Sequence, residues 1–249
     1  MSCEILVYGI GGHMGREVAA LTLSGYRETS LAAGVDPNGY DGNAICHGSL
    51  DDVTEHCDCI IDFSHHSATK ALLEYAVSNS LPLVLCTTGH TEEEKDLIHA
   101  AAEKIPLFYS ANMSLGVALL VELAKKTAAA MPEAEIEIVE AHHDRKLDAP
   151  SGTALLIAES LREVRGNVPF VCGRSGQAKR TKEEIGIHSL RMGNVVGIHE
   201  VIVATNTQTI TLKHEAHNRS LFAEGAVAAA RFLVGKPAGL YNMNSMLAE

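Results

Sequence analysis

Short apolar runs alternate with helical stretches over the first 113 residues, and this alternation is the feature that most limits the possible folds. The apolar runs cover residues 4–9, 31–36, 57–63, 81–87 and 105–110. Helical patterns follow the first run as far as Gly25 and recur at about 66–79 and 91–104. Continuous apolar strands separated by helices are typical of a parallel sheet that is covered on both faces. The pattern therefore predicts a Rossmann-like, doubly wound α/β domain.

The pattern changes in the second half of the chain. Helices are expected at about 114–130 and 152–165. Strand-like runs in which polar and apolar residues alternate lie at 135–143, 186–192, 199–204 and 207–216. Alternating strands without helices between them indicate an antiparallel or mixed sheet, so we expect a second, α+β domain. A strong helical pattern at 220–235 could return to either domain.

Composition argues against several classes of protein. The formal net charge of −11 disfavours binding to a phosphate backbone, and an aromatic content of 4% leaves few surfaces for stacking bases, so we expect no nucleic-acid partner. The N-terminus reaches glycines too soon for a signal peptide, and no apolar run approaches the ~20 residues that a membrane span needs, so we expect no membrane partner. Six scattered cysteines have neither zinc-ribbon nor thioredoxin spacing and are typical of free thiols in a reducing, cytoplasmic compartment.

A glycine cluster follows the first expected strand. Residues 7–16 read VYGIGGHMGR, so that Gly9, Gly12 and Gly15 form G-x-x-G-x-x-G between a strand and a helix. This is a variant of the dinucleotide fingerprint, in which glycines permit a tight turn and a close approach of backbone amides to a pyrophosphate. Glycines also punctuate ordinary turns, but the position between strand and helix favours a cofactor site.

Asp36 ends the second expected strand, 21 residues after Gly15. An acidic residue at this distance accepts hydrogen bonds from a ribose 2′-hydroxyl in dinucleotide-binding folds. Its other interpretation is a solvent-exposed residue of the turn VDPNG. Because a carboxylate would repel a 2′-phosphate, we expect NADH to serve at least as well as NADPH.

Proton donors and cations gather in residues 140–153, which read EAHHDRKLDAPSGT. His142 can protonate a reacting centre near neutral pH, and Lys146 can stabilise developing negative charge. Ser151 is a candidate N-cap, and the amides of Gly152 and Thr153 would point at an anion such as a carboxylate. The stretch therefore suits a small acidic substrate that receives a proton.

Two other interpretations of this stretch compete. Paired histidines can bind a metal ion, but the sequence offers no third ligand at a suitable spacing, and a lysine is an unfavourable neighbour for a divalent cation. We therefore expect no metal. A solvated charged loop is the commoner fate of such runs, although the helix start that follows directly argues against it.

The stretch from Glu140 to Ala154 also contains the unbroken pattern E-x-H-H-x-x-K-x-D-x-P-S-G-T-A. This pattern resembles the signature of the dihydrodipicolinate reductase family, also called 4-hydroxy-tetrahydrodipicolinate reductases. The resemblance extends over nearly the whole chain, including GIGGHMGR, IIDFS, CTTG, SANMSLG and SLRMGNVVGIHEV. It implies a reductase of the diaminopimelate–lysine pathway, which uses NADH or NADPH to reduce a cyclic unsaturated dicarboxylate.

The resemblance also assigns roles to residues. It implies that His142 is the proton donor and acceptor, with Lys146 as second proton donor, and that His143, Gly152 and Thr153 bind the substrate carboxylates. The implied cofactor positions are Gly9, Ile10, Gly11, Gly12, His13, Met14, Asp36, Cys86, Thr87, Thr88, Ser110, Ala111, Asn112 and Met113. Two positions depart from the family pattern, because arginine is frequent at His13 and glycine at Cys86, where a positive φ would strain a cysteine.

The resemblance further implies how the chain is divided and assembled. Residues 1–112, completed by a C-terminal helix in 220–249, would form the dinucleotide-binding domain. Residues 113–219 would bind the substrate and form the interface of a homotetramer. Two alternatives remain open: another two-domain dehydrogenase, for instance one that acts on an aspartate-derived aldehyde, and a regulator that senses a dinucleotide without turnover.

Overall fold

The computed structural model describes residues 2–248 and divides the chain into two compact units. The first unit takes in the chain as far as Ser114 and resumes at Ser220. The second unit is Leu115–Arg219. Within residues 2–248, none of the helices combines the length and the apolar character that crossing a membrane requires.

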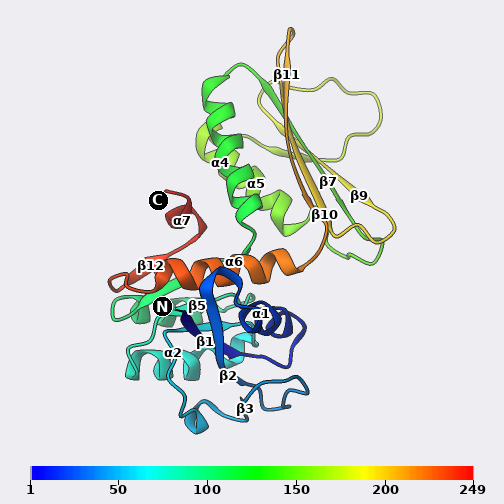
Figure 1. Ribbon diagram of the computed structural model, residues 1–249. Coiled ribbons are helices and arrows are strands. Elements are labelled where there is room, and N and C mark those ends of the chain that lie inside the picture. Colours follow the sequence, from blue (N-terminus) through cyan, green and yellow to red (C-terminus); the bar gives the residue numbers. More distant parts are fainter. Residues whose placement is uncertain (1, 249) are drawn as a thin grey trace. The chain divides into compact units, whose positions relative to one another are not determined.

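The first unit contains a seven-stranded sheet in which every neighbouring pair is parallel (Figure 1). Its strands are β1 (Cys3–Tyr8), β2 (Thr29–Val35), β3 (Cys46–His47), β4 (Cys59–Asp62), β5 (Leu83–Leu85), β6 (Pro106–Tyr109) and β12 (Gly239–Tyr241). They lie in the order β12-β6-β5-β4-β1-β2-β3. Apart from β12, this is the order of dinucleotide-binding folds, in which the direction of winding reverses beside β1. The prediction of a Rossmann-like, doubly wound sheet is confirmed.

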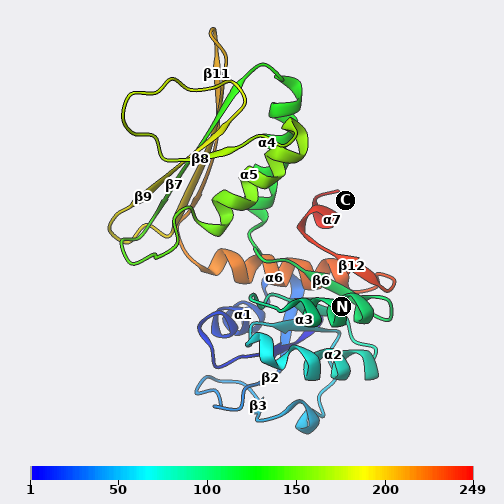
Figure 2. The same ribbon diagram turned by 180° about the vertical axis from the view of Figure 1, so that it is seen from behind.

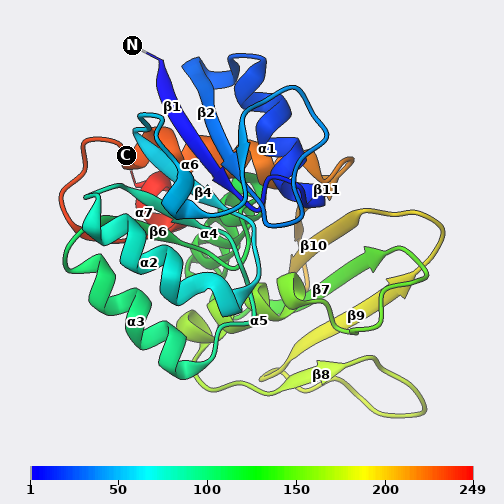
Figure 3. The same cartoon turned by 90° about the horizontal axis from the view of Figure 1, so that it is seen from below.

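Helices cover both faces of this sheet. They are α1 (His13–Leu23), α2 (Thr69–Ser78), α3 (Glu92–Ala102), α6 (Ser220–Leu233) and the short α7 (Met243–Leu247), with the 3-10 turns η1 (Tyr26–Glu28), η2 (Leu50–Asp52) and η3 (His66–Ala68). Helix α6 packs on β4, β5 and β6 beside α1, while α2 and α3 pack together on the other face (Figure 3). Leu72 and Ile98 of α2 and α3 meet Leu6, Ile60 and Leu83 of the sheet in one fully buried core.

The second unit is a five-stranded mixed sheet with two helices on one face (Figure 2). Its elements are α4 (Leu115–Ala130), β7 (Glu135–His142), α5 (Gly152–Arg165), β8 (Phe170–Cys172), β9 (Ile185–Arg191), β10 (Gly197–Ala204) and β11 (Thr209–Ala216). In the order β11-β10-β7-β9-β8, β10 is antiparallel to both of its neighbours and the other pairs are parallel. The prediction of a mixed sheet is confirmed.

Side chains along β7 point alternately to the two faces of the sheet, and one of these faces contains both core residues and polar residues. Ile136 and Ile138 point to the helices and pack against Leu120, Ile157 and Val201. Side chains two residues apart share a face of a strand, so the positions that follow on the same face are 140 and 142. The apolar face of β7 therefore continues directly into Glu140 and His142.

A single glycine lets α6 approach the end of the segment that follows β6. A Cβ atom added at Gly225 would overlap the backbone carbonyl of Met113, whose side chain is itself buried. The neighbouring atom is backbone, so it cannot rotate away as a side chain would. Glycine at 225 is therefore a packing requirement of the first unit.

We expect G225A to lower stability although alanine is the better helix former. Alanine gains up to about 1 kcal/mol over glycine in a helix interior, but overpacking a close contact costs typically about 1–3 kcal/mol. The expected result is a lower Tm in thermal unfolding. G48A is the matched control, because Gly48 has no heavy atom within 4 Å of an added Cβ. Equal Tm values for both variants would contradict the packing argument.

Candidate functional site

The glycine turn after β1 lies at the point where the winding of the sheet reverses. Gly9 adopts a φ of +81°, and a Cβ there would lie 2.8 Å from the carbonyl oxygen of Phe63, which follows β4. A Cβ at Gly15 would overlap the carbonyl of Gly9. Gly12 is the N-cap of α1, so the amides of His13 and Met14 point out of the helix N-terminus. The turn is a cradle of bare backbone that fits a pyrophosphate.

Asp36 stands directly after β2 and beside this turn. Its Oδ2 accepts a hydrogen bond of 3.0 Å from the amide of Gly11, and its Oδ1 accepts one of 2.9 Å from the amide of Asn38. The side chain is 9% exposed, so it is not a solvated turn residue. Arg16 donates from Nε to the carbonyl of Gly11 at 2.8 Å and lies over the Tyr40 ring. Sequence analysis did not single out this cation.

A buried carboxylate organises the turn after β5. Asp62, the last residue of β4, is fully buried, and burial raises the pKa of its carboxyl. Thr87 donates from its hydroxyl to Asp62 Oδ2 at 2.6 Å, and the amide of Ser64 donates to Oδ1 at 2.9 Å. Thr88 is exposed while Thr87 is buried. Asp62 thus ties the ends of β4 and β5 together at the carboxyl edge of the sheet.

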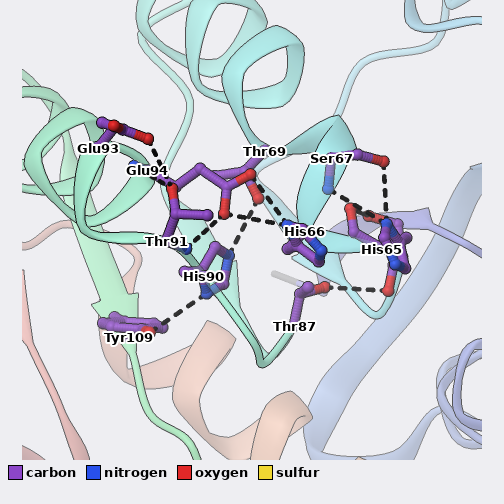
Figure 4. Close-up of polar contacts among 11 residues, drawn as sticks. His65, His66, Ser67, Thr69, Thr87, His90, Thr91, Glu93, Glu94 and Tyr109 are labelled. Carbon is purple, nitrogen blue, oxygen red and sulfur yellow. Dashed lines mark hydrogen bonds and ion pairs between the residues drawn. The ribbon is translucent and has the colours of Figure 1, made fainter.

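A second network, drawn in Figure 4, surrounds His90. His90 Nε2 lies 3.0 Å from the Thr69 hydroxyl, and His90 Nδ1 lies 3.2 Å from the Tyr109 hydroxyl. Burial lowers the pKa of this imidazole. Nearby, His66 Nδ1 lies 3.0 Å from Glu94, which also completes the capping box of α3. These contacts connect the starts of α2 and α3 with the ends of β5 and β6. Sequence analysis missed them because no motif links residues so far apart.

The remaining candidate cofactor positions follow β5 and β6. Ser110 donates from its hydroxyl to the carbonyl of Asn112 at 2.8 Å, and Ala111 between them is exposed. Met113 is 3% exposed and packs inside the unit. The strain expected at Cys86 is absent: among residues 2–248, Arg27, Glu28 and Ser80 are the non-glycine residues with positive φ, and in this turn Gly89 takes that conformation instead. Burial raises the pKa of the Cys86 thiol well above its usual range.

In the second unit, His142 is held at the end of β7 by a fully buried carboxylate. His142 Nδ1 lies 2.6 Å from Glu140 Oε2. Arg191 of β9 donates from both terminal nitrogens to the two oxygens of Glu140, each at 2.8 Å. Burial would raise the pKa of Glu140, but hydrogen bonds, with those from Arg191 the largest, lower it to about 2. Glu140 is therefore ionised at neutral pH.

The helix start that follows lies against the same carboxylate. Ser151 is the N-cap of α5, as predicted, because its hydroxyl accepts from the amide of Ala154 at 3.2 Å. The backbone amide of Ser151 donates to Glu140 Oε1 at 3.1 Å, and its hydroxyl lies 3.1 Å from His199 Nε2. The amides of Gly152 and Thr153 belong to the first turn of this helix, whose N-terminus favours an anion.

The loop between β7 and α5 places the other candidates. Lys146 pairs with Asp148 at 2.8 Å, and this pairing lowers the pKa of Asp148. His143 Nδ1 is buried without a hydrogen-bond partner in the part of the chain that the structure describes. Burial lowers the pKa of His142, while the charge of Glu140 acts in the opposite direction. All five candidates thus belong to β7, to the loop that follows it or to the first turn of α5.

Sequence analysis did not assign roles to Glu140, Arg191 or His199. Glu140 belongs to the motif but was taken only as the end of a strand, and the other two lie about 50 to 60 residues away on partner strands. Strand pairing that brings such residues together cannot be read from local periodicity. Among residues 2–248, no group of three or more His, Cys, Asp or Glu side chains is arranged to hold a metal ion.

Comparisons with known proteins agree on one family. The model of the dihydrodipicolinate reductase N-terminus matches residues 3–113, and the model of its C-terminus matches residues 116–247. A 4-hydroxy-tetrahydrodipicolinate reductase of Clostridium tetani is 41% identical over 98% of this chain and 96% of its own length. Another, from Caldanaerobacter subterraneus, is 41% identical over 99% of both chains.

Solved structures agree with the sequence comparisons. A dipicolinate-bound dihydrodipicolinate reductase from Paenisporosarcina sp. TG-14 superposes with a TM-score of 0.83 at 26% identity, covering 98% of this chain and 99% of the other. A myo-inositol dehydrogenase from Corynebacterium glutamicum, at a TM-score of 0.62 and 16% identity over 96% of this chain and 90% of its own, shares the fold. The chain therefore belongs to the dihydrodipicolinate reductase family along both its N-terminal and its C-terminal part.

Proposed function

We propose that this chain reduces 4-hydroxy-tetrahydrodipicolinate to tetrahydrodipicolinate with NADH or NADPH, as a step of the diaminopimelate route to lysine. The observation that carries the proposal is a histidine held by a buried carboxylate beside a lysine and a helix N-terminus, in a chain of this family. The two alternatives, another dehydrogenase and a regulator without turnover, are less well supported. Relatives with this name cover 98–99% of the chain, and the site has groups for turnover as well as binding.

The first unit holds the cofactor in this proposal. The backbone of Gly9, Gly12 and Met14 takes the pyrophosphate, and Asp36 takes the ribose of the adenosine half. The turn at 86–88 and the segment 110–113 receive the nicotinamide half, at the carboxyl ends of β5 and β6. When bound, the reduced nicotinamide supplies the hydride.

The second unit holds the dicarboxylate. The amides of Gly152 and Thr153 bind its carboxylates together with the imidazole of His143, whose Nδ1 has no hydrogen-bond partner within residues 2–248. Lys146 exchanges its partner Asp148 for the substrate, so that one ion pair replaces another. Support for an acidic ring comes from the Paenisporosarcina relative, which was solved with dipicolinate bound.

His142 supplies the proton from Nε2, because its Nδ1 is engaged by Glu140. Lys146 assists as a second donor and offsets the negative charge that develops on the ring. The overall change adds one hydride and one proton to the ring, and it releases one water when the hydroxylated ring is the starting compound. We further propose that the chain acts in the cytoplasm as a homotetramer formed through the sheet of the second unit.

H142Q and K146A are expected to lose most turnover while NADH binding persists, because both residues belong to the second unit. Removing a general acid typically costs roughly 10²–10⁴-fold in rate. Turnover is measured as NADH consumption after adding freshly made 4-hydroxy-tetrahydrodipicolinate, and binding as the change in NADH fluorescence. If both variants kept the turnover of the wild type, these residues would be removed from the mechanism.

The pH dependence should differ between kcat/KM and kcat. The donor is protonated His142, so rates fall as the pH rises through its pKa, and burial lowers that pKa in the free protein. A bound dianion favours the imidazolium and raises the pKa in the complex. Since kcat/KM reports the free enzyme and kcat the complex, we expect the alkaline limb of kcat/KM at lower pH than that of kcat. Coinciding limbs would argue against His142 as the titrating donor.

Asp36 should set the preference between the two cofactors. We expect kcat/KM with NADH to be at least equal to that with NADPH, because the carboxylate repels a 2′-phosphate. D36S removes the charge and keeps a small acceptor for the amide of Gly11, so the NADPH-to-NADH ratio should rise by about tenfold, equivalent to ~1.4 kcal/mol. Steady-state kinetics with both cofactors measures the ratio, and an unchanged ratio would show that Asp36 does not read the ribose.

A further inference from the structure

At least four hydrogen-bond donors converge on the side chain of Glu140, and the Ser189 side chain of β9 also lowers its pKa. His142 Nδ1 and one Arg191 nitrogen meet Oε2, and the other Arg191 nitrogen and the Ser151 amide meet Oε1. The carboxylate is fully buried, so protein groups supply all its hydrogen bonds in place of water. Three elements, β7, β9 and the start of α5, are thus tied to one pair of oxygens.

We propose that Glu140, fixed by Arg191, is the positioning residue that couples the proton donor to the anion-binding helix start. It selects the nitrogen through which His142 exchanges its proton, and it anchors α5 at the same time. The inference rests on the proposed function, since it assigns a task to a residue that touches neither substrate nor cofactor.

Glu140 determines the tautomer of His142. An ionised carboxylate is only an acceptor, so Nδ1 must carry a hydrogen in both protonation states. The exchangeable proton is then on Nε2. Gly197 of β10 stands opposite this nitrogen, where a Cβ would lie 3.2 Å from Nε2, so the absence of a side chain leaves room for a reacting group.

Glu140 also holds the start of α5. The Ser151 amide is bound to the same carboxylate, and the Ser151 hydroxyl lies 3.1 Å from His199, which is 4% exposed. Burial lowers the pKa of His199 to about 4, so this imidazole is neutral and adds no charge. Its ring packs edge-on against that of His142 at 5.1 Å. The contacts form a closed circuit from His142 through Glu140, Ser151 and His199 back to His142.

Arg191 extends the circuit to the loop that carries Lys146. The same terminal nitrogen that binds Glu140 Oε1 donates to the carbonyl of Asp148 at 2.6 Å. A guanidinium can hold both oxygens of a carboxylate in a fixed plane, which an ammonium cannot. The charged groups that face His142 are thus Glu140, Lys146 and Arg191, with neutral His199 on the adjacent strand.

The opposite face of the same strand offers a matched control. Glu137 of β7 lies 2.8 Å from His188 Nε2 and 2.8 Å from Arg180 Nε, so it also joins a histidine and an arginine. Its side chain is 26% exposed, whereas that of Glu140 is 0% exposed. Side chains three residues apart on a strand point to opposite faces, so Glu137 lies away from His142.

The experiment compares E140Q with E137Q in the full chain. An amide cannot accept from all these donors, and its NH₂ group would face either His142 or the helix start. We expect kcat of E140Q to fall at least about tenfold, within the range that general acid catalysis supplies. The alkaline limb of its kcat profile should move to lower pH, because the imidazolium loses its negative partner. E137Q should keep the kcat and the pH profile of the wild type.

A readout that needs no turnover tests the tautomer directly. In ¹H–¹⁵N spectra of the imidazoles, neutral His142 of the wild type should carry its hydrogen on Nδ1. The inference would be overturned by any of three results. The hydrogen of neutral His142 could lie on Nε2, E140Q could keep the kcat and pH profile of the wild type, or E137Q could lose as much kcat as E140Q. If E140Q does not fold, R191K takes its place, with a weaker loss of kcat expected and an unchanged kcat contradicting it. Failure of the wild type to consume NADH would remove the proposed function, while the spectra would still decide the pairing.

Discussion

A charge buried in the sheet of the second unit determines how its functional groups are arranged. Removing a carboxylate from water costs several kcal/mol, and the cost is offset only when donors surround it. Glu140 has Arg191, His142 and the Ser151 amide as donors, and breaking a buried pair of this kind costs about 3–5 kcal/mol. The same hydrogen bonds that stabilise the fold therefore fix the positions of the imidazole, the arginine and the helix start relative to one another. Stability and orientation cannot be varied independently at this site.

In the first unit, the turn after β1 presents backbone amides because its glycines have no side chains to cover them. Gly9 and Gly15 bring two stretches of backbone so close that a Cβ on either would meet a carbonyl. A surface of bare amides at a helix N-terminus can bind a phosphate through the backbone, with little dependence on titration. Buried Asp62 and His90 then fix the turns at the other strands of the same edge. In the proposed function each unit thus contributes one kind of chemistry: backbone recognition in the first and proton transfer in the second.

Elements whose signals lie within a few neighbouring residues could be predicted from the sequence. The strands at 4–9 and 135–143, the helix at 152–165 and the N-cap Ser151 follow from periodicity and capping, and the structure places them within one or two residues. Strands β3, β8 and β12 were missed because two or three residues carry too little alternation to detect. The strain expected at Cys86 was wrong, because the turn takes its positive φ at Gly89. Arg191 and Asp62 were missed because their partners depend on strand register.

A net charge of −11 is unfavourable for the binding of the proposed dianionic substrate, but the local balance of charge at the site differs from the global one. Arg191 neutralises the buried charge of Glu140, and Asp148 balances Lys146, a pairing that the substrate replaces in the proposed function. Charges at the surface are screened beyond about 8 Å at physiological ionic strength, whereas partly buried groups are screened much less. In the proposed function, a dianion that enters the site therefore experiences a lysine, a helix N-terminus and an imidazole that it helps to protonate more strongly than the acidic surface. Local arrangement, and not total charge, decides which substrate this chain can hold.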